Sequence, residues 1–152
     1  MKKFAIASDH AGFELKETIK QYLTGKGYDL TDFGTFTTDS CDYPDFAHPA
    51  AQSVVNGECE MGIAICGSGN GMQITLNKYP QIRAALCWLP ELAALARQHN
   101  DANFLVMPAR FISTDEALKI TDAFLNADFE GGRHLRRVNK IPRNISVEGE
   151  VM

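Results

Sequence analysis

The sequence predicts an α/β fold, a three-layer α/β/α sandwich built on a five-stranded parallel sheet. Short apolar runs alternate along the chain with segments of helical periodicity. This alternation favours parallel strands joined by right-handed crossovers, with helices on both faces of the sheet. Such a sheet is Rossmann-like, and ligands bind it beyond the carboxyl ends of its strands. The 152 residues suit a single domain, in which we expect residues 143–152 to be a loosely held tail.

Each predicted strand is an apolar run that ends at polar or turn-forming residues. The first ends in a Ser-Asp-His-Ala-Gly turn, and the third runs into a glycine-rich loop. The second is the weakest, and a loop rich in Thr, Asp and Ser follows it over residues 34–45. The predicted strands cover residues 4–8, 28–33, 61–66, 82–87 and 104–107.

The predicted helices are bounded by residues that favour helix ends. Asn56-Gly57 marks the end of the second helix, and Pro90 marks the start of the fourth. The stretch from Ser113 to Glu116 has the S-x-x-E form of a capping box and opens the fifth. The predicted helices cover residues 13–25, 46–55, 69–76, 90–98, 113–125 and 132–140.

The composition is that of an ordinary soluble globular protein. A formal net charge of −4 gives no general basis for binding nucleic acid or an anionic membrane. No apolar stretch approaches the roughly 20 residues of a membrane span, and the apolar start of the chain is too short for a signal peptide. The four cysteines lack the spacing of a zinc site, so we expect no metal and reduced thiols in a cytoplasmic protein.

The segment over residues 61–72, MGIAICGSGNGM, is the central functional signal of the sequence. Its apolar strand ends at Cys66, and three glycines follow within five residues. Because glycine has no Cβ, the backbone of this loop can approach a ligand closely. The unpaired N–H groups at the start of the following helix favour negative charge, so we expect a lowered pKa for the Cys66 thiol.

The glycine loop matches none of three common phosphate-binding loops. A dinucleotide fingerprint beginning at Gly67 and Gly69 would need a third glycine where Met72 stands. The Gly-Lys-Ser/Thr end of a P-loop is absent, and a C-x5-R phosphatase loop would need arginine at position 72. The remaining interpretation is a functional thiol beside backbone N–H groups. The alternative is that Cys66 is a small core residue. We adopt that alternative for the other three cysteines, Cys41, Cys59 and Cys87.

Polar residues follow two further predicted strands. Asp9 and His10 come after the first strand, and Arg110 comes after the fifth. Since the carboxyl ends of parallel strands share one edge of the sheet, we expect these residues to converge on Cys66. His48 is interpreted as an ordinary surface or core histidine.

Two polar groups lie on other segments. His99 belongs to a polar cluster at a helix end, where a C-terminal cap with an asparagine stop is the alternative. Arg133 and Arg137 are four residues apart on one face of a basic helix, a spacing that suits a phosphate dianion. A solvated helix face is the alternative for these arginines.

Together these segments resemble the type B ribose-5-phosphate isomerases, a family that also includes allose-6-phosphate and galactose-6-phosphate isomerases. The resemblance runs from the first strand to the last helix. The motifs that carry it are Ser8-Asp9-His10-Ala11-Gly12, Asp42-Tyr43-Pro44-Asp45, Cys66-Gly67-Ser68-Gly69-Asn70-Gly71, Asn77 with Ile82-Arg83-Ala84-Ala85, His99-Asn100-Asp101-Ala102-Asn103, Ala109-Arg110, and Gly131-Gly132-Arg133-His134 with Arg137.

The resemblance implies an aldose–ketose isomerase that works through an enediolate without metal or cofactor. Cys66 would be the base that moves a proton between C2 and C1, while Ser68 and the loop N–H groups stabilise the enediolate oxygen. His99 would assist opening of the sugar ring. The residues implied to bind substrate are Asp9, Tyr43 and Asn100 at the sugar, His10, Arg110, Arg133 and Arg137 at the phosphate, and Gly67, Gly69, Asn70 and Gly71 in the loop.

Departures from the family pattern leave the sugar open between ribose 5-phosphate and a six-carbon phosphate. Position 72 is Met72, whereas one branch of the family that lacks the cysteine has glutamate there, so the thiol is the evident base. The turn Cys87-Trp88-Leu89-Pro90 replaces a more polar one, and Met107-Pro108 stands where Leu-Gly is common. A cysteine hydrolase and a non-catalytic sugar-phosphate binding module are the rival interpretations.

The predicted topology bears on assembly. His99 ends a helix that leads into the fifth strand, so it should lie near the amino ends of the strands, far from Cys66 of the same chain. Arg133 and Arg137 should lie there as well. We therefore expect a homodimer with shared active sites, which could pair further into a tetramer.

Overall fold

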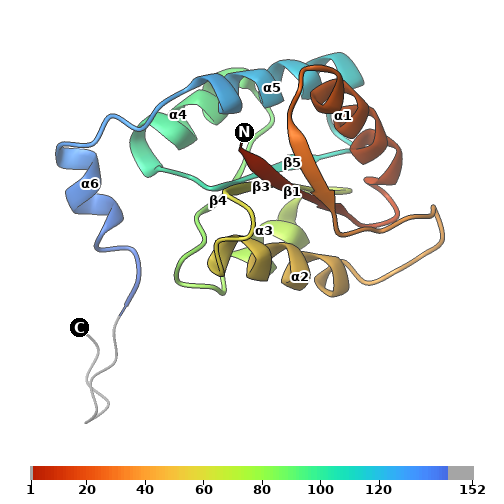
Figure 1. The fold of residues 1–152 in the computed structure, drawn as a ribbon, viewed down its shortest axis with the longest axis horizontal. Coiled ribbons are helices and arrows are strands. Elements are labelled where there is room, and N and C mark those ends of the chain that lie inside the picture. Colours follow the sequence, from red (N-terminus) through yellow and green to blue (C-terminus); the bar gives the residue numbers. More distant parts are fainter. Residues whose placement is uncertain (1, 144–152) are drawn as a thin grey trace, which may run out of the picture.

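The computed structural model describes residues 2–143 and has the predicted three-layer α/β/α fold (Figure 1). The strands are β1 (Lys3–Ser8), β2 (Asp29–Asp32), β3 (Met61–Cys66), β4 (Ala84–Leu86) and β5 (Phe104–Pro108). The helices are α1 (Phe13–Gly25), α2 (Pro44–Val55), α3 (Asn70–Leu76), α4 (Pro90–Asn100), α5 (Thr114–Asn126) and α6 (Arg133–Val138). The expected tail falls outside the described residues apart from residue 143.

The five strands form one parallel sheet with the order β2-β1-β3-β5-β4. The central strand β3 pairs with β1 so that Ile65 is opposite Ser8, and with β5 so that Cys66 is opposite Pro108. The chain steps away in opposite directions from β1 and β3. The carboxyl ends of these two strands therefore form the switch point at which ligands bind in doubly wound sheets.

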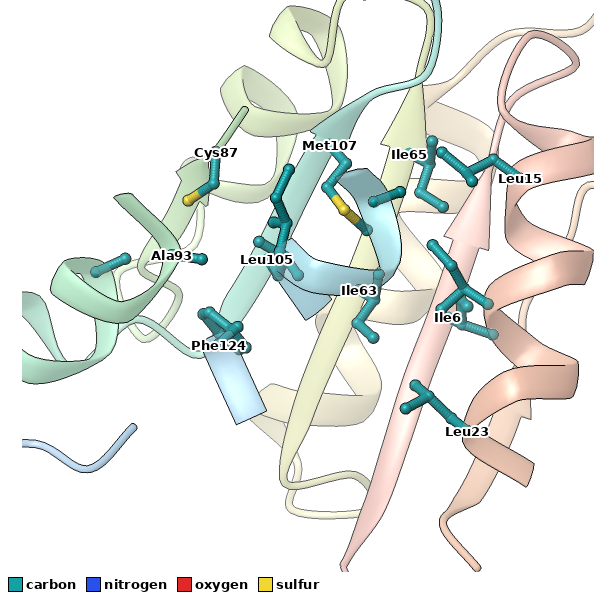
Figure 2. Close-up of a cluster of buried hydrophobic side chains, with 14 of the residues drawn as sticks. Ile6, Leu15, Leu23, Ile63, Ile65, Cys87, Ala93, Leu105, Met107 and Phe124 are labelled. Atoms are coloured by element: carbon teal, nitrogen blue, oxygen red, sulfur yellow. The ribbon is translucent and has the colours of Figure 1, made fainter. Parts of the chain in front are cut away.

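Helices cover both faces of the sheet, with α1, α4 and α5 on one side and α2 and α3 on the other (Figure 1). The first face is packed with large side chains, as Figure 2 shows for Ile6, Ile63, Leu105 and Phe124. The second face is packed largely with alanine, which lets α2 lie close to the strands. These buried alanines are Ala5, Ala7 and Ala64 on the strands and Ala47, Ala50 and Ala51 on α2.

Most predicted boundaries agree with the structure to within one or two residues. The predicted strand over 82–87 is shorter, because side-chain amides take over its hydrogen bonds. The backbone N–H of Arg83 donates to Asn103 Oδ1 at 2.7 Å, and that of Ala84 donates to Asn77 Oδ1 at 2.8 Å. The capping box at Ser113 is confirmed. Within the described residues, no helix combines the length and apolar character that a bilayer crossing needs.

Candidate active site

Cys66 ends β3 and lies at the bottom of the glycine loop. Only 4 % of it is exposed, since its side chain belongs to the alanine-rich face of the sheet. The loop turns into α3 at Gly69, whose φ of 81° is in the left-handed region that favours glycine. Ser68 Oγ accepts a hydrogen bond from the N–H of Asn70 at 3.3 Å, which shapes the turn. The thiol is therefore held below a ring of backbone N–H groups.

The pKa of the Cys66 thiol is raised, which corrects the sequence-based expectation. Burial raises it most, and the nearby negative charge of Asp9 raises it further. The backbone N–H groups of Met72, Gly69 and Gly71 lower the pKa, as expected for the start of a helix, but they do not outweigh burial. The N–H groups thus favour negative charge, while burial keeps the thiol protonated at neutral pH.

The glycines of this loop make room for two neighbouring side chains. A Cβ on Gly71 would lie 2.6 Å from Cε1 of Tyr43, so the tyrosine ring packs directly on the loop. A Cβ on Gly67 would lie 3.3 Å from Nη1 of Arg110. The backbone also joins the two strand ends, because the N–H of Arg110 donates to the carbonyl of Gly67 at 3.0 Å. Tyr43 and Arg110 therefore both border the glycine loop.

Asp9 and His10 reach the same edge from β1. The N–H of Asp9 donates to the carbonyl of Ile65 at 3.2 Å, and the Asp9 carboxylate accepts from the N–H of Gly12 at 3.1 Å. Nδ1 of His10 accepts from the N–H of Cys41 at 3.3 Å, which leaves Nε2 as the protonated nitrogen and a donor. Cys41 is therefore half-buried beside His10, whereas the sequence analysis assigned it to the core.

The other predicted site residues do not join this group within one chain. Helix α4 runs back from the carboxyl end of β4 to the amino end of β5, and His99 and Asn100 form its last residues. Helix α6, with Arg133 and Arg137, packs against α4 at the side of the molecule (Figure 1). The helix stop is Asp101, which has φ 47°, rather than the expected asparagine.

His99 lies in a cluster that the sequence analysis did not identify. Its ring stacks on that of His134 with centroids 4.2 Å apart and planes 8° from parallel. Oε1 of Glu130 lies 3.7 Å from Nε2 of His99 and 3.5 Å from Nε2 of His134. Glu130 and His134 are four residues apart, a spacing that indicates a shared face within a helix. Glu130 lies in the loop between α5 and α6, where this spacing has no such meaning, so the sequence did not reveal the pair.

This cluster has the residue types of a metal site but not the geometry. The three donor atoms lie within 4.8 Å of one another. The lone pairs of imidazole nitrogens lie in the ring planes, and nearly parallel rings 4.2 Å apart direct theirs side by side rather than at one point. An ion bound to one ring would lie far out of the plane of the other. The arrangement favours a role for the histidines themselves.

The remaining histidine and a groove beside β4 contribute little to the site. Nδ1 of His48 lies 2.7 Å from the hydroxyl of Tyr79, in agreement with an ordinary surface role. A groove of about 640 Å³ runs along the β4 edge between α3 and α4, and its lining includes Asn100 but not Cys66. The groove that reaches the end of α4 thus does not include the thiol.

Comparison with known proteins gives consistent matches over almost the whole chain. The family model described as Ribose/Galactose Isomerase matches residues 4–141. Ribose-5-phosphate isomerase B of Escherichia coli is 45 % identical over 141 residues, which cover 93 % of this chain and 95 % of that protein. A ribose 5-phosphate isomerase from Thermotoga maritima has 53 % identity and a TM-score of 0.91, covering 93 % of this chain and 97 % of its own.

A further solved structure contains a sugar phosphate. Ribose-5-phosphate isomerase B from Mycoplasma genitalium, solved with bound ribulose-5-phosphate, superposes with a TM-score of 0.88 and 45 % identity. The match covers 91 % of this chain and 93 % of that one.

Proposed function

Since the chain belongs to the Ribose/Galactose Isomerase family, we propose that it interconverts ribose 5-phosphate and ribulose 5-phosphate with Cys66 as the base. The chain is an aldose–ketose isomerase, and relatives with 45 % and 53 % identity carry the name of the pentose enzyme. The observation that carries the residue assignment is the Cys66 thiol beneath the N–H groups of Gly69, Gly71 and Met72.

The reaction moves one proton between neighbouring carbons. The Cys66 thiolate removes the proton from C2 of the open-chain aldose, and the electron pair of that C–H bond forms the C1–C2 double bond of an enediolate. Negative charge builds up on the former aldehyde oxygen, where the loop N–H groups and Ser68 act as preorganised donors. The proton then returns to C1, while the proton of the C2 hydroxyl passes to the C1 oxygen, so that the C1 oxygen becomes a hydroxyl and C2 becomes the ketone carbon. A base and an oxyanion site each contribute about 10² or more in rate.

The other residues bind and prepare the substrate. Asp9 and Tyr43 contact the sugar beside the thiol, and His10 and Arg110 hold the phosphate at the same strand edge. The distance of the phosphate from the reacting carbons makes it an anchor for orientation. No metal or cofactor takes part in the proposed reaction. The four free cysteines support a reducing compartment, the cytoplasm.

We propose that the site is completed by a second copy of the chain. His99 opens the sugar ring, Asn100 contacts its hydroxyls, and Arg133 and Arg137 add to the phosphate site from the partner subunit. The proposal is supported by the course of α4, which ends at the opposite side of the sheet from the Cys66 loop. A homodimer related by a two-fold axis would contain two such sites.

The substrate assignment is tested by a coupled assay with ribose 5-phosphate, allose 6-phosphate and galactose 6-phosphate. We expect the largest kcat/KM for the pentose, and a larger value for either hexose would reject that choice.

A Cys66→Ala variant tests the base. We expect loss of turnover with retained sugar-phosphate binding and no covalent intermediate in the parent protein, whereas a trapped thioester would indicate a hydrolase. Full turnover in the variant would reject the thiol base.

A further inference from the structure

The histidine stack at the end of α4 contains an unsatisfied polar atom. His134 is 6 % exposed, and its Nε2 is fully buried without a hydrogen-bond partner among the described residues. Burying such an atom unpaired is destabilising. If the stack served packing alone, an apolar ring in place of His134 would be more stable. The position of His134 therefore calls for an explanation in terms of the ring that it contacts.

Glu130 is tied to the same helix end. Its backbone N–H donates to the carbonyl of Gln98 at 3.0 Å, one residue before His99. Its carboxylate then faces Nε2 of both rings, at 3.7 Å for His99 and 3.5 Å for His134. An ionised carboxylate only accepts hydrogen bonds. At these distances, which exceed hydrogen-bond length, the Glu130 carboxylate acts on both rings through its charge and favours a proton on the nitrogen that it faces.

We propose that His134 and Glu130 are positioning residues that fix the ring orientation and the tautomer of His99. The inference rests on the proposed function, in which His99 opens the sugar ring. The His99 side chain is 40 % exposed, and a free imidazole at such a place would rotate and divide between two tautomers. Stacking on His134 limits the rotation, and Glu130 limits the tautomers. His99 then meets the substrate already oriented.

The electrostatic surroundings support this division of roles. Burial lowers the pKa of His134, and the neighbouring His99, Arg133 and Arg137 lower it further, while Glu130 acts in the opposite direction. His134 is therefore neutral at neutral pH. A neutral ring at 4.2 Å adds no positive charge beside His99.

The test compares a substrate that needs ring opening with one that does not. Ribose 5-phosphate is largely a furanose, whereas ribulose 5-phosphate has no free C5 hydroxyl to close a ring and stays open. We expect His134→Ala to lower kcat for ribose 5-phosphate about tenfold, part of the 10² or more that an acid–base group supplies. Solvent hydrogen exchange at C1 of ribulose 5-phosphate should change less than about twofold, since it needs no ring opening.

Two further variants separate positioning from folding. His134→Phe keeps the stacked ring and should recover most of the lost kcat. Glu130→Gln should lower kcat by about threefold and convert the His99 nitrogen-15 spectrum from one tautomer to a mixture. Glu60→Gln is the matched control, because Glu60 has the same 51 % side-chain exposure and, within residues 2–143, its carboxylate pairs only with Lys2 at 4.0 Å.

Each result of these measurements supports or rejects one specific role. An equal loss in both assays for His134→Ala, or no loss in either, would overturn the positioning role. An unchanged tautomer in Glu130→Gln would overturn the role of the carboxylate. If the parent protein catalyses neither ribose 5-phosphate turnover nor ribulose 5-phosphate exchange, the proposed function itself fails.

Discussion

The ring of Tyr43 lies directly on the backbone of Gly71, with space for a hydrogen but not for a methyl group. A Cβ at Gly71 would come within 2.6 Å of two ring carbons of Tyr43. The residue that precedes α2 is thereby placed against the first turn of α3. The tyrosine proposed to contact the sugar and the proposed oxyanion loop are thus in direct contact, so a change in one should move the other.

Gly71→Ala tests this contact. Because the tyrosine ring would have to move, we expect KM for ribose 5-phosphate to rise about tenfold, in line with the 1–3 kcal/mol typical of overpacking. The measurement is steady-state kinetics with a thermal unfolding curve. Gly25→Ala is the control, since a Cβ there meets nothing within 4 Å. Unchanged kinetics in Gly71→Ala would contradict the proposed contact of Tyr43 with the sugar.

The raised pKa of Cys66 predicts an alkaline rise of activity. The thiolate is the proposed base, and burial raises the pKa of the thiol above its ordinary value of about 8.5. We expect log kcat/KM to increase with pH by one unit per pH unit from about pH 7 to above pH 8.5, because kcat/KM reports ionisations of the free enzyme. A pH–rate profile measures it. A plateau already reached at pH 7 would mean that the thiolate forms more easily than burial allows.

Hybrid dimers test whether sites are shared. Cys66→Ala and His99→Gln chains carry different affinity tags, and the mixed dimer is purified by both. If each site uses Cys66 of one chain and His99 of the other, one site of the hybrid carries both changes and the other none, so about half of the parent activity returns. Both parental variants should be nearly inactive. A hybrid as inactive as its parents would place both residues of a site in one chain.

Asp32 is predicted to stabilise the fold through a buried lysine. Lys16 is fully buried, and its Nζ is paired with the Asp32 carboxylate. Asp32→Asn leaves that charge without its main partner, so we expect a loss of about 3 kcal/mol in the free energy of unfolding at pH 7. Urea unfolding measures the loss. Asp29→Asn, on the exposed start of the same strand, is the control and should cost little.

The stabilisation by Asp32 should also depend on pH. Burial alone would raise the pKa of Asp32, but hydrogen bonds from Lys16 and Lys20 lower it below its usual value. A depressed folded-state pKa means stability that is present above the unfolded value of about 3.9 and lost as pH falls through the folded value. The gap between parent and Asp32→Asn should therefore shrink below about pH 4. A constant gap down to pH 2 would contradict this linkage.

The fold could be predicted from the sequence because its signals are local. The strand ending at Cys66 and the capping box at Ser113 were located to the residue. The strand leading to Leu86 was overextended, since the amides of Asn77 and Asn103 that end its pairing come from distant segments.

The site was predictable where strand ends determine it and less so where packing does. Asp9 and Arg110 followed from the carboxyl-edge rule. The direction of the Cys66 pKa shift was predicted wrongly, because burial depends on the whole fold whereas the helix start is visible locally. Glu130 was missed for the same reason, since its approach to His99 depends on how the chain returns after α5.

The two faces of the sheet should tolerate different kinds of amino-acid substitution, because one of them is packed largely with alanine. An alanine at full burial has almost nothing to lose by truncation, so harmful changes at Ala7, Ala50 or Ala64 are those that add atoms. On the opposite face, Ile63 and Phe124 can be damaged chiefly by removing atoms. Saturation mutagenesis should therefore show that larger side chains are rejected on the alanine-rich face and smaller ones on the opposite face. The stricter upper limit lies on the side that carries the thiol.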